Sequence, residues 1–181
     1  MGALRTTTAT AIALAALPLA VLAQGPAKGQ PGRQPGLPDT LAIIVHRSNP
    51  VVQLTLIELR RIFMLEKQTW PHGRKITVVL REKGQRERTD AIRLICGIDE
   101  AEYDRYILLQ TFRGQIGQGP RSILTGTGML RFVFNAPGAI GSVSADQLDG
   151  STKVLQIDGR LPGDPRYPLR LGARRPENGV K

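Results

Sequence analysis

The sequence predicts an α/β domain with a mostly parallel sheet of four to five strands flanked by helices. Three observations carry this prediction. Short β-branched runs alternate with segments of helical spacing, helix-capping residues open several of those segments, and Gly or Pro separates them. The pattern is confined to residues 40–160, so we expect a single folded domain there.

The first part of this region predicts two buried strands with a helix between them. Leu41–His46 and Ile76–Leu80 are apolar runs rich in Ile and Val, which are typical of strands buried on both faces. Between the two runs, Thr55 and Glu58 have the spacing of a capping box. Apolar residues then recur at helical spacing, so a helix is expected over residues 55–66.

Two further helices are expected after the second strand. Residues 85–96 carry apolar side chains on one helical face, and Gly97 is suited to end that helix. Asp99 begins a second capping pattern, from which the next helix would run to Gly114.

The last part of the domain predicts one more helix and two strands. Thr127 is positioned to cap a helix that runs through Asn135. The sequence Pro137-Gly138 then predicts a turn. Two apolar segments complete the expected sheet, Ala139–Ser144 and Lys153–Ile157.

The segments that flank the domain have other compositions. Residues 1–23 have a basic residue, an uncharged run of 14 residues and a small residue, Ala23, at the end, as in a secretory signal peptide cleaved near Ala23. The run is too short to span a bilayer, and the sequence has no second long apolar run, so the mature chain is expected to have no membrane span and to be periplasmic or secreted. Residues 24–39 predict a Pro/Gly-rich disordered leader, and residues 161–181 a basic, Pro-rich tail that buries no core.

Composition excludes several classes of function. The chain has 25 Lys and Arg against 15 Asp and Glu, a formal charge of +10, which suits an anionic ligand. The charge is dispersed and aromatic residues are few, which argues against nucleic-acid binding. The single cysteine, Cys96, and two distant histidines, His46 and His72, form no metal-binding or catalytic pattern. We therefore expect no catalytic residues, no metal and no cofactor.

Three segments in correct order resemble the periplasmic phosphate-binding proteins of ABC transporters, which have the type II solute-binding fold. Leu41–Gly73 resembles the family's hydrophobic strand, Asn-Pro, helix and tryptophan turn. Ile76–Arg88 resembles the family's strand followed by an Arg, a Gly and a helix start. Val133–Val143 resembles its Pro-Gly-Ala-Ile-Gly segment. The resemblance implies a single lobe of the type II fold, in a small phosphate-binding-like form.

Two departures from the family pattern bear on function. The strand and Ser-Gly-Ser element of the first lobe are expected before Leu41, and only the signal and the leader precede it. The family's Ser-Gly-Thr helix start is replaced here by Gln-Arg-Glu. Together with the loop composition, the resemblance implies a phosphate or oxyanion site. Its expected ligand-binding residues are Arg81, Gly84, Gln85, Arg86 and Arg88.

Two interpretations of the loop and of the protein stay open. Glu82 and Glu87 place negative charge beside the arginines, so the loop is either an oxyanion site or a solvated turn whose charges pair with each other. The protein is accordingly either an exported, non-enzymatic solute-binding-like protein that binds phosphate weakly within an ABC-transport or envelope system, or an envelope scaffold that interacts with a protein partner and has no small-molecule ligand.

Overall fold

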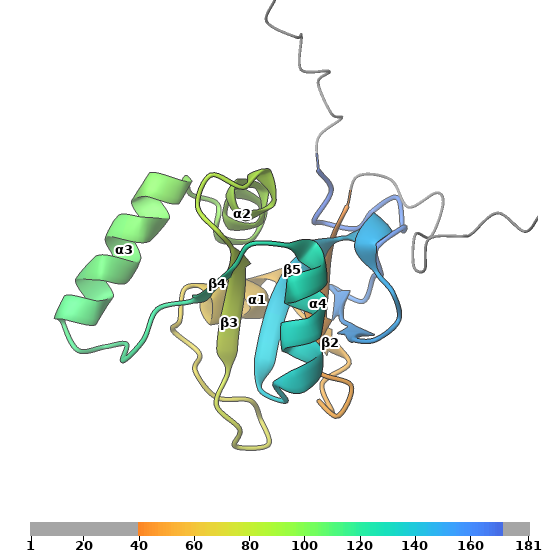
Figure 1. The fold of residues 1–181 in the computed structure, drawn as a ribbon, viewed down its shortest axis with the longest axis horizontal. Helices are drawn as coiled ribbons and strands as arrows, with labels where there is room; N and C mark the ends of the chain where they lie inside the picture. Colours follow the sequence, from red (N-terminus) through yellow and green to blue (C-terminus); the bar gives the residue numbers. More distant parts are fainter. Residues whose placement is uncertain (1–39, 172–181) are drawn as a thin grey trace, which may run out of the picture.

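The computed structural model describes residues 40–171, which form a central five-stranded sheet in the order β4-β3-β5-β1-β6 and a separate pair of short strands, β2 and β7 (Figure 1). The strands are β1 (Leu41–Val45), β2 (Gln53–Leu54), β3 (Thr77–Arg81), β4 (Arg121–Ile123), β5 (Ala139–Ser144), β6 (Lys153–Val154) and β7 (Gln156–Ile157). The helices are α1 (Leu56–Phe63), α2 (Arg86–Ala91), the π-helical turn η1 (Ile92–Cys96), α3 (Glu100–Phe112), α4 (Gly126–Asn135) and the 3-10 turn η2 (Ala145–Gln147).

The central sheet is mixed. Strand β3 runs parallel to β4 and β5, whereas β1 runs antiparallel to β5 and β6. The predicted α/β class and strand number are therefore confirmed, and two of the four strand pairs are antiparallel where a mostly parallel sheet was expected. The direction of β1 depends on a strand far along the chain, which the local composition of β1 does not encode.

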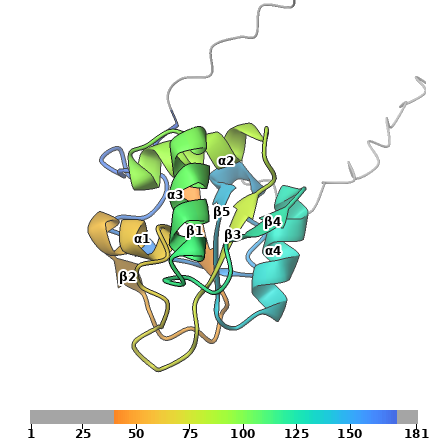
Figure 2. The same cartoon turned by 90° about the vertical axis from the view of Figure 1, so that its left-hand side faces the viewer.

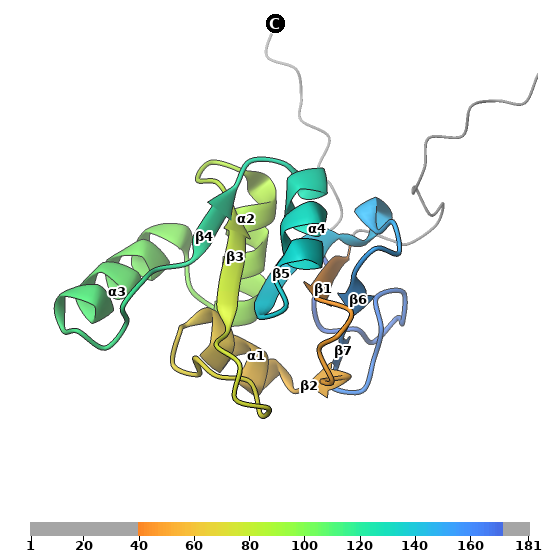
Figure 3. The same cartoon turned by 60° about the horizontal axis from the view of Figure 1, so that its bottom comes forward.

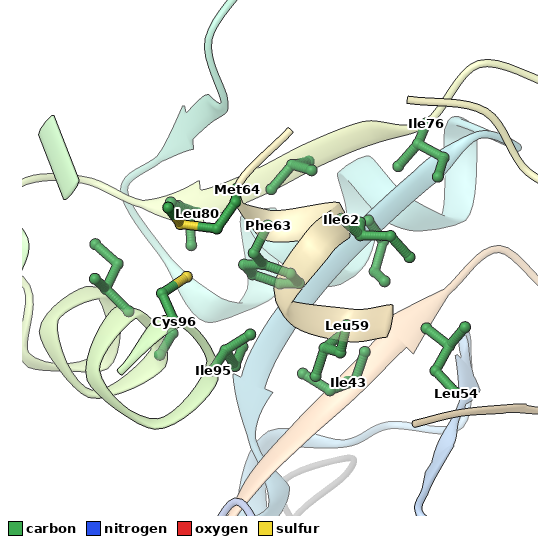
Figure 4. Packing of buried hydrophobic residues seen from close by; sticks show 14 of the residues in the cluster. Ile43, Leu54, Leu59, Ile62, Phe63, Met64, Ile76, Leu80, Ile95 and Cys96 are labelled. Carbon is green, nitrogen blue, oxygen red and sulfur yellow. The ribbon is translucent and has the colours of Figure 1, made fainter. Parts of the chain in front are cut away.

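Side chains alternate between the two faces of the sheet, and each face has its own hydrophobic cluster. Figure 2 shows the sheet between α4 on one side and α1, α2 and α3 on the other. On the α4 side, Val79 and Gly141 lie close to Met129, and a Cβ at Gly141 would lie 2.7 Å from the Met129 sulfur. On the α1 side, Leu59, Ile62 and Phe63 pack over the strands (Figure 4).

The capping residues position the helices much as the sequence predicts, with shifts at some ends. Thr55 and Glu58 form the expected capping box at α1. The Asp99 carboxylate accepts the Glu102 N–H at the start of α3, over 2.7 Å. Helix α4 begins two residues earlier than expected, because the Thr125 side chain, rather than that of Thr127, caps it by accepting the Gly128 N–H.

Three departures concern short strands and one helix. The expected strand Lys153–Ile157 is divided between β6, which joins the central sheet, and β7, which pairs with β2. Strand β4 lacks an apolar run because it is an exposed edge strand, and this is why its sequence did not predict it. The helix expected over residues 85–96 changes to π-helical geometry at Ile92 and ends at Gly97, whose φ of 72° suits glycine.

The packed unit extends past residue 160 into the segment expected to bury nothing. Tyr167 and Leu169 are fully or almost fully buried. The Leu41 N–H donates to the Leu169 carbonyl over 2.9 Å, and the Tyr167 hydroxyl donates to the Leu41 carbonyl over 3.1 Å. Residues 167–170 therefore contact the start of β1 as part of the fold, which corrects the prediction of a tail without core contacts.

The remaining terminal predictions fall outside the described residues. The signal peptide, the Pro/Gly-rich leader and residues 172–181 lie in this part of the chain. Within residues 40–171, no helix has the length and apolar character needed to cross a bilayer.

Candidate functional site

The candidate site lies where β3 ends and the chain turns into α2. Arg81 is the last residue of β3, and its loop reaches α2 through Gly84 and Gln85 (Figure 3). The Gln85 N–H donates to the Glu82 carbonyl over 3.2 Å and closes the turn. Gly84 has a φ of 79°, a conformation that residues with a Cβ rarely adopt, so glycine is needed to make this turn. The sequence-predicted glycine therefore shapes the loop.

The Arg81 guanidinium is the main feature of the site, because it is buried and only partly satisfied. Its side chain is 9% exposed. The Nη2 atom donates to Gln85 Oε1 over 3.4 Å and lies 4.0 Å from Glu87 Oε2. The Nε and Nη1 atoms are buried without a protein hydrogen-bond partner. Leaving buried donors of a charged group unpaired costs free energy. A hydrogen-bond acceptor added beside these nitrogens would recover part of that cost.

Arg88 occupies a different position from the one the sequence suggested. Its guanidinium is buried, donating from Nε to Glu100 Oε1 over 2.6 Å and from Nη2 to Asp104 Oδ1 over 2.8 Å. Its Nη1 also donates to the Arg81 carbonyl over 3.3 Å. Two carboxylates therefore hold Arg88 and fix α3 against the end of β3. We leave Arg88 out of the ligand-binding set, because its donors are already used.

Of the other predicted ligand residues, Gln85 and Arg86 lie at the helix start with different partners. Gln85 is the residue that precedes α2, and its side chain accepts from Arg81 instead of capping the helix. Arg86 is largely exposed and pairs with Asp90 one turn later, over 3.3 Å. Glu87 is partly exposed, and its carboxylate lies 4.0 Å from Arg81 Nη2, where it partly offsets the charge of the guanidinium.

The structure thus brings Arg81, Gly84 and Gln85 together, and it adds Glu87 as a fourth member. The sequence identified Glu87 as opposing charge, but the burial of Arg81 and its two unpaired nitrogens could not be read from the sequence. The sequence hinted at the special position of Arg81 only by placing an arginine at the carboxyl end of an apolar strand. Within the described residues, no group of three or more His, Cys, Asp or Glu side chains could hold a metal ion.

Comparisons with known proteins indicate the fold. No family model and no curated protein match the chain. Among solved structures, it is similar to an ABC-type phosphate transport receptor from Vibrio cholerae, with a TM-score of 0.56, 24% identity and coverage of 68% of this chain and 48% of that one. A putative phosphate ABC transporter substrate-binding protein from Clostridium perfringens, solved with bound phosphate, has a TM-score of 0.56, 26% identity and coverage of 68% and 47%.

A third similar structure, PstS from Borrelia burgdorferi, has a TM-score of 0.55, 16% identity and coverage of 68% and 49%. This chain therefore spans about half the length of each of these proteins. The resemblance to phosphate-binding proteins that its motifs suggested is confirmed at the level of the fold, over part of their length.

Proposed function

We propose that this chain, which folds as about half of a phosphate-binding protein, is a non-enzymatic, solute-binding-like protein that binds phosphate or a similar oxyanion weakly at the β3–α2 loop. One observation carries the proposal: the buried Arg81 guanidinium has two nitrogens without protein partners. A bound oxyanion would accept hydrogen bonds from them, and charge-assisted pairs of this kind are stronger than neutral ones.

Three features of the loop support an anion there. Gly84 carries no side chain over the turn, and nothing lies within 4 Å of the position a Cβ would take. The first N–H groups of a helix have no partners within the helix, and α2 begins directly after Gln85. Arg86 adds a second positive charge at the rim. We propose that Arg81 binds the anion, with Gly84, Gln85 and Arg86 around it.

Two features keep the proposed affinity low. The Glu87 carboxylate lies 4.0 Å from Arg81 Nη2, so its negative charge opposes an anion at the same guanidinium. The proposed donors also all belong to the β3–α2 loop and the start of α2, so they contact the anion from one side. We expect a dissociation constant near 1 mM, equivalent to about 4 kcal/mol of binding free energy.

The cellular setting belongs to the same proposal. We propose that residues 1–23 direct export, that cleavage occurs near Ala23, and that the mature chain works in the periplasm or as a secreted protein with an envelope protein partner. The basic residue and 14-residue apolar run at the start of the sequence support export.

A second candidate function is an envelope scaffold that has the fold without a small-molecule ligand. The observation that favours it is the Arg81–Glu87 pair itself, which partly neutralises the buried guanidinium. In this alternative, the exported domain interacts with a protein partner and the loop is structural.

The test compares anion-dependent stability in variants of this loop. Phosphate at about ten times a millimolar dissociation constant should raise the free energy of unfolding by about 1.4 kcal/mol. Arg81→Ala should remove this effect, and Arg81→Lys should restore part of it, because lysine lacks the planar fork of donors. Arg121→Ala, on the exposed strand β4, is the control and should leave the effect intact. Sulfate and chloride at matched ionic strength test specificity.

Glu87→Gln keeps the result interpretable if Arg81→Ala unfolds the protein. Removing the competing carboxylate with an isosteric amide should strengthen phosphate binding several-fold, while Glu82→Gln, the matched control in the same loop, should change it little. Backbone amide signals of residues 84–86 should shift on phosphate titration. If phosphate stabilises neither the parent nor the Glu87→Gln variant, the scaffold interpretation replaces the binding one.

A further inference from the structure

Helix α3 carries apolar side chains on two opposite sides, and only one of these sides packs against the domain. Tyr103 is buried, and Tyr106 and Ile107 are partly buried against the core. On the other side, Leu108 is 55% exposed, Leu109 46% and Phe112 82%. A helix with apolar residues all round is normally covered on all sides, so this one lacks a partner for its outer side.

The outer apolar residues form one continuous surface. Arg105, Leu108, Leu109 and Phe112 are spaced by three or four residues, which places them on one face of the helix. We call these four residues the α3 outer face. In Figures 1 and 3, α3 projects from the side of the domain next to the edge strand β4. All four residues of the α3 outer face are exposed.

The helix is held so that the outer face cannot turn inward. The Tyr103 hydroxyl donates to the Phe63 carbonyl over 2.7 Å, which fixes the inner side to α1. The buried Arg88 bonds to both Glu100 and Asp104 on the first half of α3. These contacts set the rotation of α3 about its axis, and they leave Leu108 and Phe112 on the solvent side.

The charged residues beside the α3 outer face can pair between two copies of α3 when the copies pack antiparallel. Exposed Glu102 lies six residues before Leu108, and exposed Arg113 lies five residues after it. Two copies of α3 packed antiparallel, with the two-fold axis near Leu108, place each Glu102 opposite the Arg113 of the other copy. Arg105 then lies opposite Phe112, where a guanidinium over an aromatic ring is favourable. Parallel packing would instead leave each Glu102 about 16 Å along the helix from the Arg113 of the other copy, because 11 residues separate them.

We propose that the α3 outer face is a homodimer interface in which two copies of this chain pair antiparallel through α3. The pairing is isologous, because each copy contributes the same residues about the two-fold axis. Helix α3 has 13 residues and is about 20 Å long, so its face alone covers less than the roughly 800 Å² per partner of a standard stable interface. A reversible, concentration-dependent dimer is therefore expected.

Sedimentation velocity over a wide concentration range tests the association and its residues. The parent chain should shift from monomer to dimer as concentration rises. Phe112→Ala should weaken the dimer at least about tenfold, a loss of about 1.4 kcal/mol. Ile57→Ala is the matched control, since Ile57 is 74% exposed on another helix, α1, and should leave dimerisation unchanged. A parent chain that stays monomeric, or a dimer unaffected by Phe112→Ala, would overturn the proposal.

Charge reversal and disulfide trapping test the orientation. Glu102→Arg or Arg113→Glu alone should weaken the dimer, and the double variant should restore it. Under oxidation, a mixture of Glu102→Cys and Arg113→Cys chains should form mixed disulfide dimers, whereas Glu102→Cys alone should not cross-link. The native Cys96 is fully buried and does not interfere. Efficient cross-linking of Glu102→Cys chains to each other would show parallel packing and refute the antiparallel interface.

Discussion

Leu169 offers a direct measure of whether the C-terminal segment belongs to the fold. Its side chain is fully buried, and its carbonyl accepts the N–H of Leu41, the first residue of β1, over 2.9 Å. Two residues earlier, the Tyr167 hydroxyl reaches the Leu41 carbonyl. The segment therefore covers one end of a central strand, and we predict that Leu169→Ala strongly destabilises the protein.

The magnitude follows from the kind of contact that is lost. The substitution keeps the backbone hydrogen bond and removes only buried side-chain carbons, which for Leu→Ala in cores costs about 2–5 kcal/mol. A value near 3 kcal/mol corresponds to a fall in Tm of roughly 10 °C for a domain of this size. Because small domains have only about 5–15 kcal/mol of total stability, this is a large fraction of it.

Urea unfolding followed by circular dichroism, together with thermal melts, measures the effect. Leu161→Ala is the matched control, because it makes the same change eight residues earlier at a side chain that is 48% exposed. We expect the control to stay within about 0.5 kcal/mol of the parent chain. If Leu169→Ala matches Leu161→Ala, the segment does not dock on β1 in solution and the reasoning from its burial is refuted.

Four further predictions concern the helices and turns that support the sheet. Gly138→Ala should lower the free energy of unfolding by about 1–3 kcal/mol in urea titration, because a Cβ there would collide with the backbone carbonyl of Lys75. Cys96 should react with a thiol reagent only after unfolding, because burial raises its pKa to about 12; rapid labelling of the native protein would contradict this. Thr55→Ala should cost about 1 kcal/mol, measured by thermal melts, through loss of the α1 cap. Hydrogen bonds from Thr55 lower the pKa of Glu58 below 4.5, so the stability this provides is present above that pH and lost as pH falls through the folded pKa. Glu58→Gln should flatten this part of the acid titration.

Local signals in the sequence were sufficient for the elements that depend on near neighbours. The runs that became β1, β3 and β5 are buried and apolar, and a buried strand requires that composition. Thr55 and Asp99 cap their helices because each side chain satisfies an N–H three residues away. The arginine and glycine of the β3–α2 loop were also identifiable, since Gly84 meets a local backbone requirement.

Contacts between distant residues were decided only by the tertiary structure. The polar strand β4 forms a strand because β3 lies beside it, and its own composition carries little signal. Tyr167 and Leu169 are buried by β1, more than 120 residues earlier, in a segment whose prolines suggested no structure. No periodic pattern in the sequence predicts the antiparallel direction of β1 or the docking of this segment. Both depend on which surfaces of distant segments meet when the chain folds.

The candidate site shows the same division. The sequence placed Arg81, Gln85, Arg86 and Arg88 in one loop and helix start, with Arg81 expected to bind the anion and the other two arginines to add positive charge. The fold separates them: Glu100 and Asp104 hold Arg88, Arg86 faces solvent, and Arg81 is buried with two unpaired nitrogens. The sequence by itself determines which charges are present, but burial and partners decide which of them can act, because the free energy of a charge depends on the groups and the water around it.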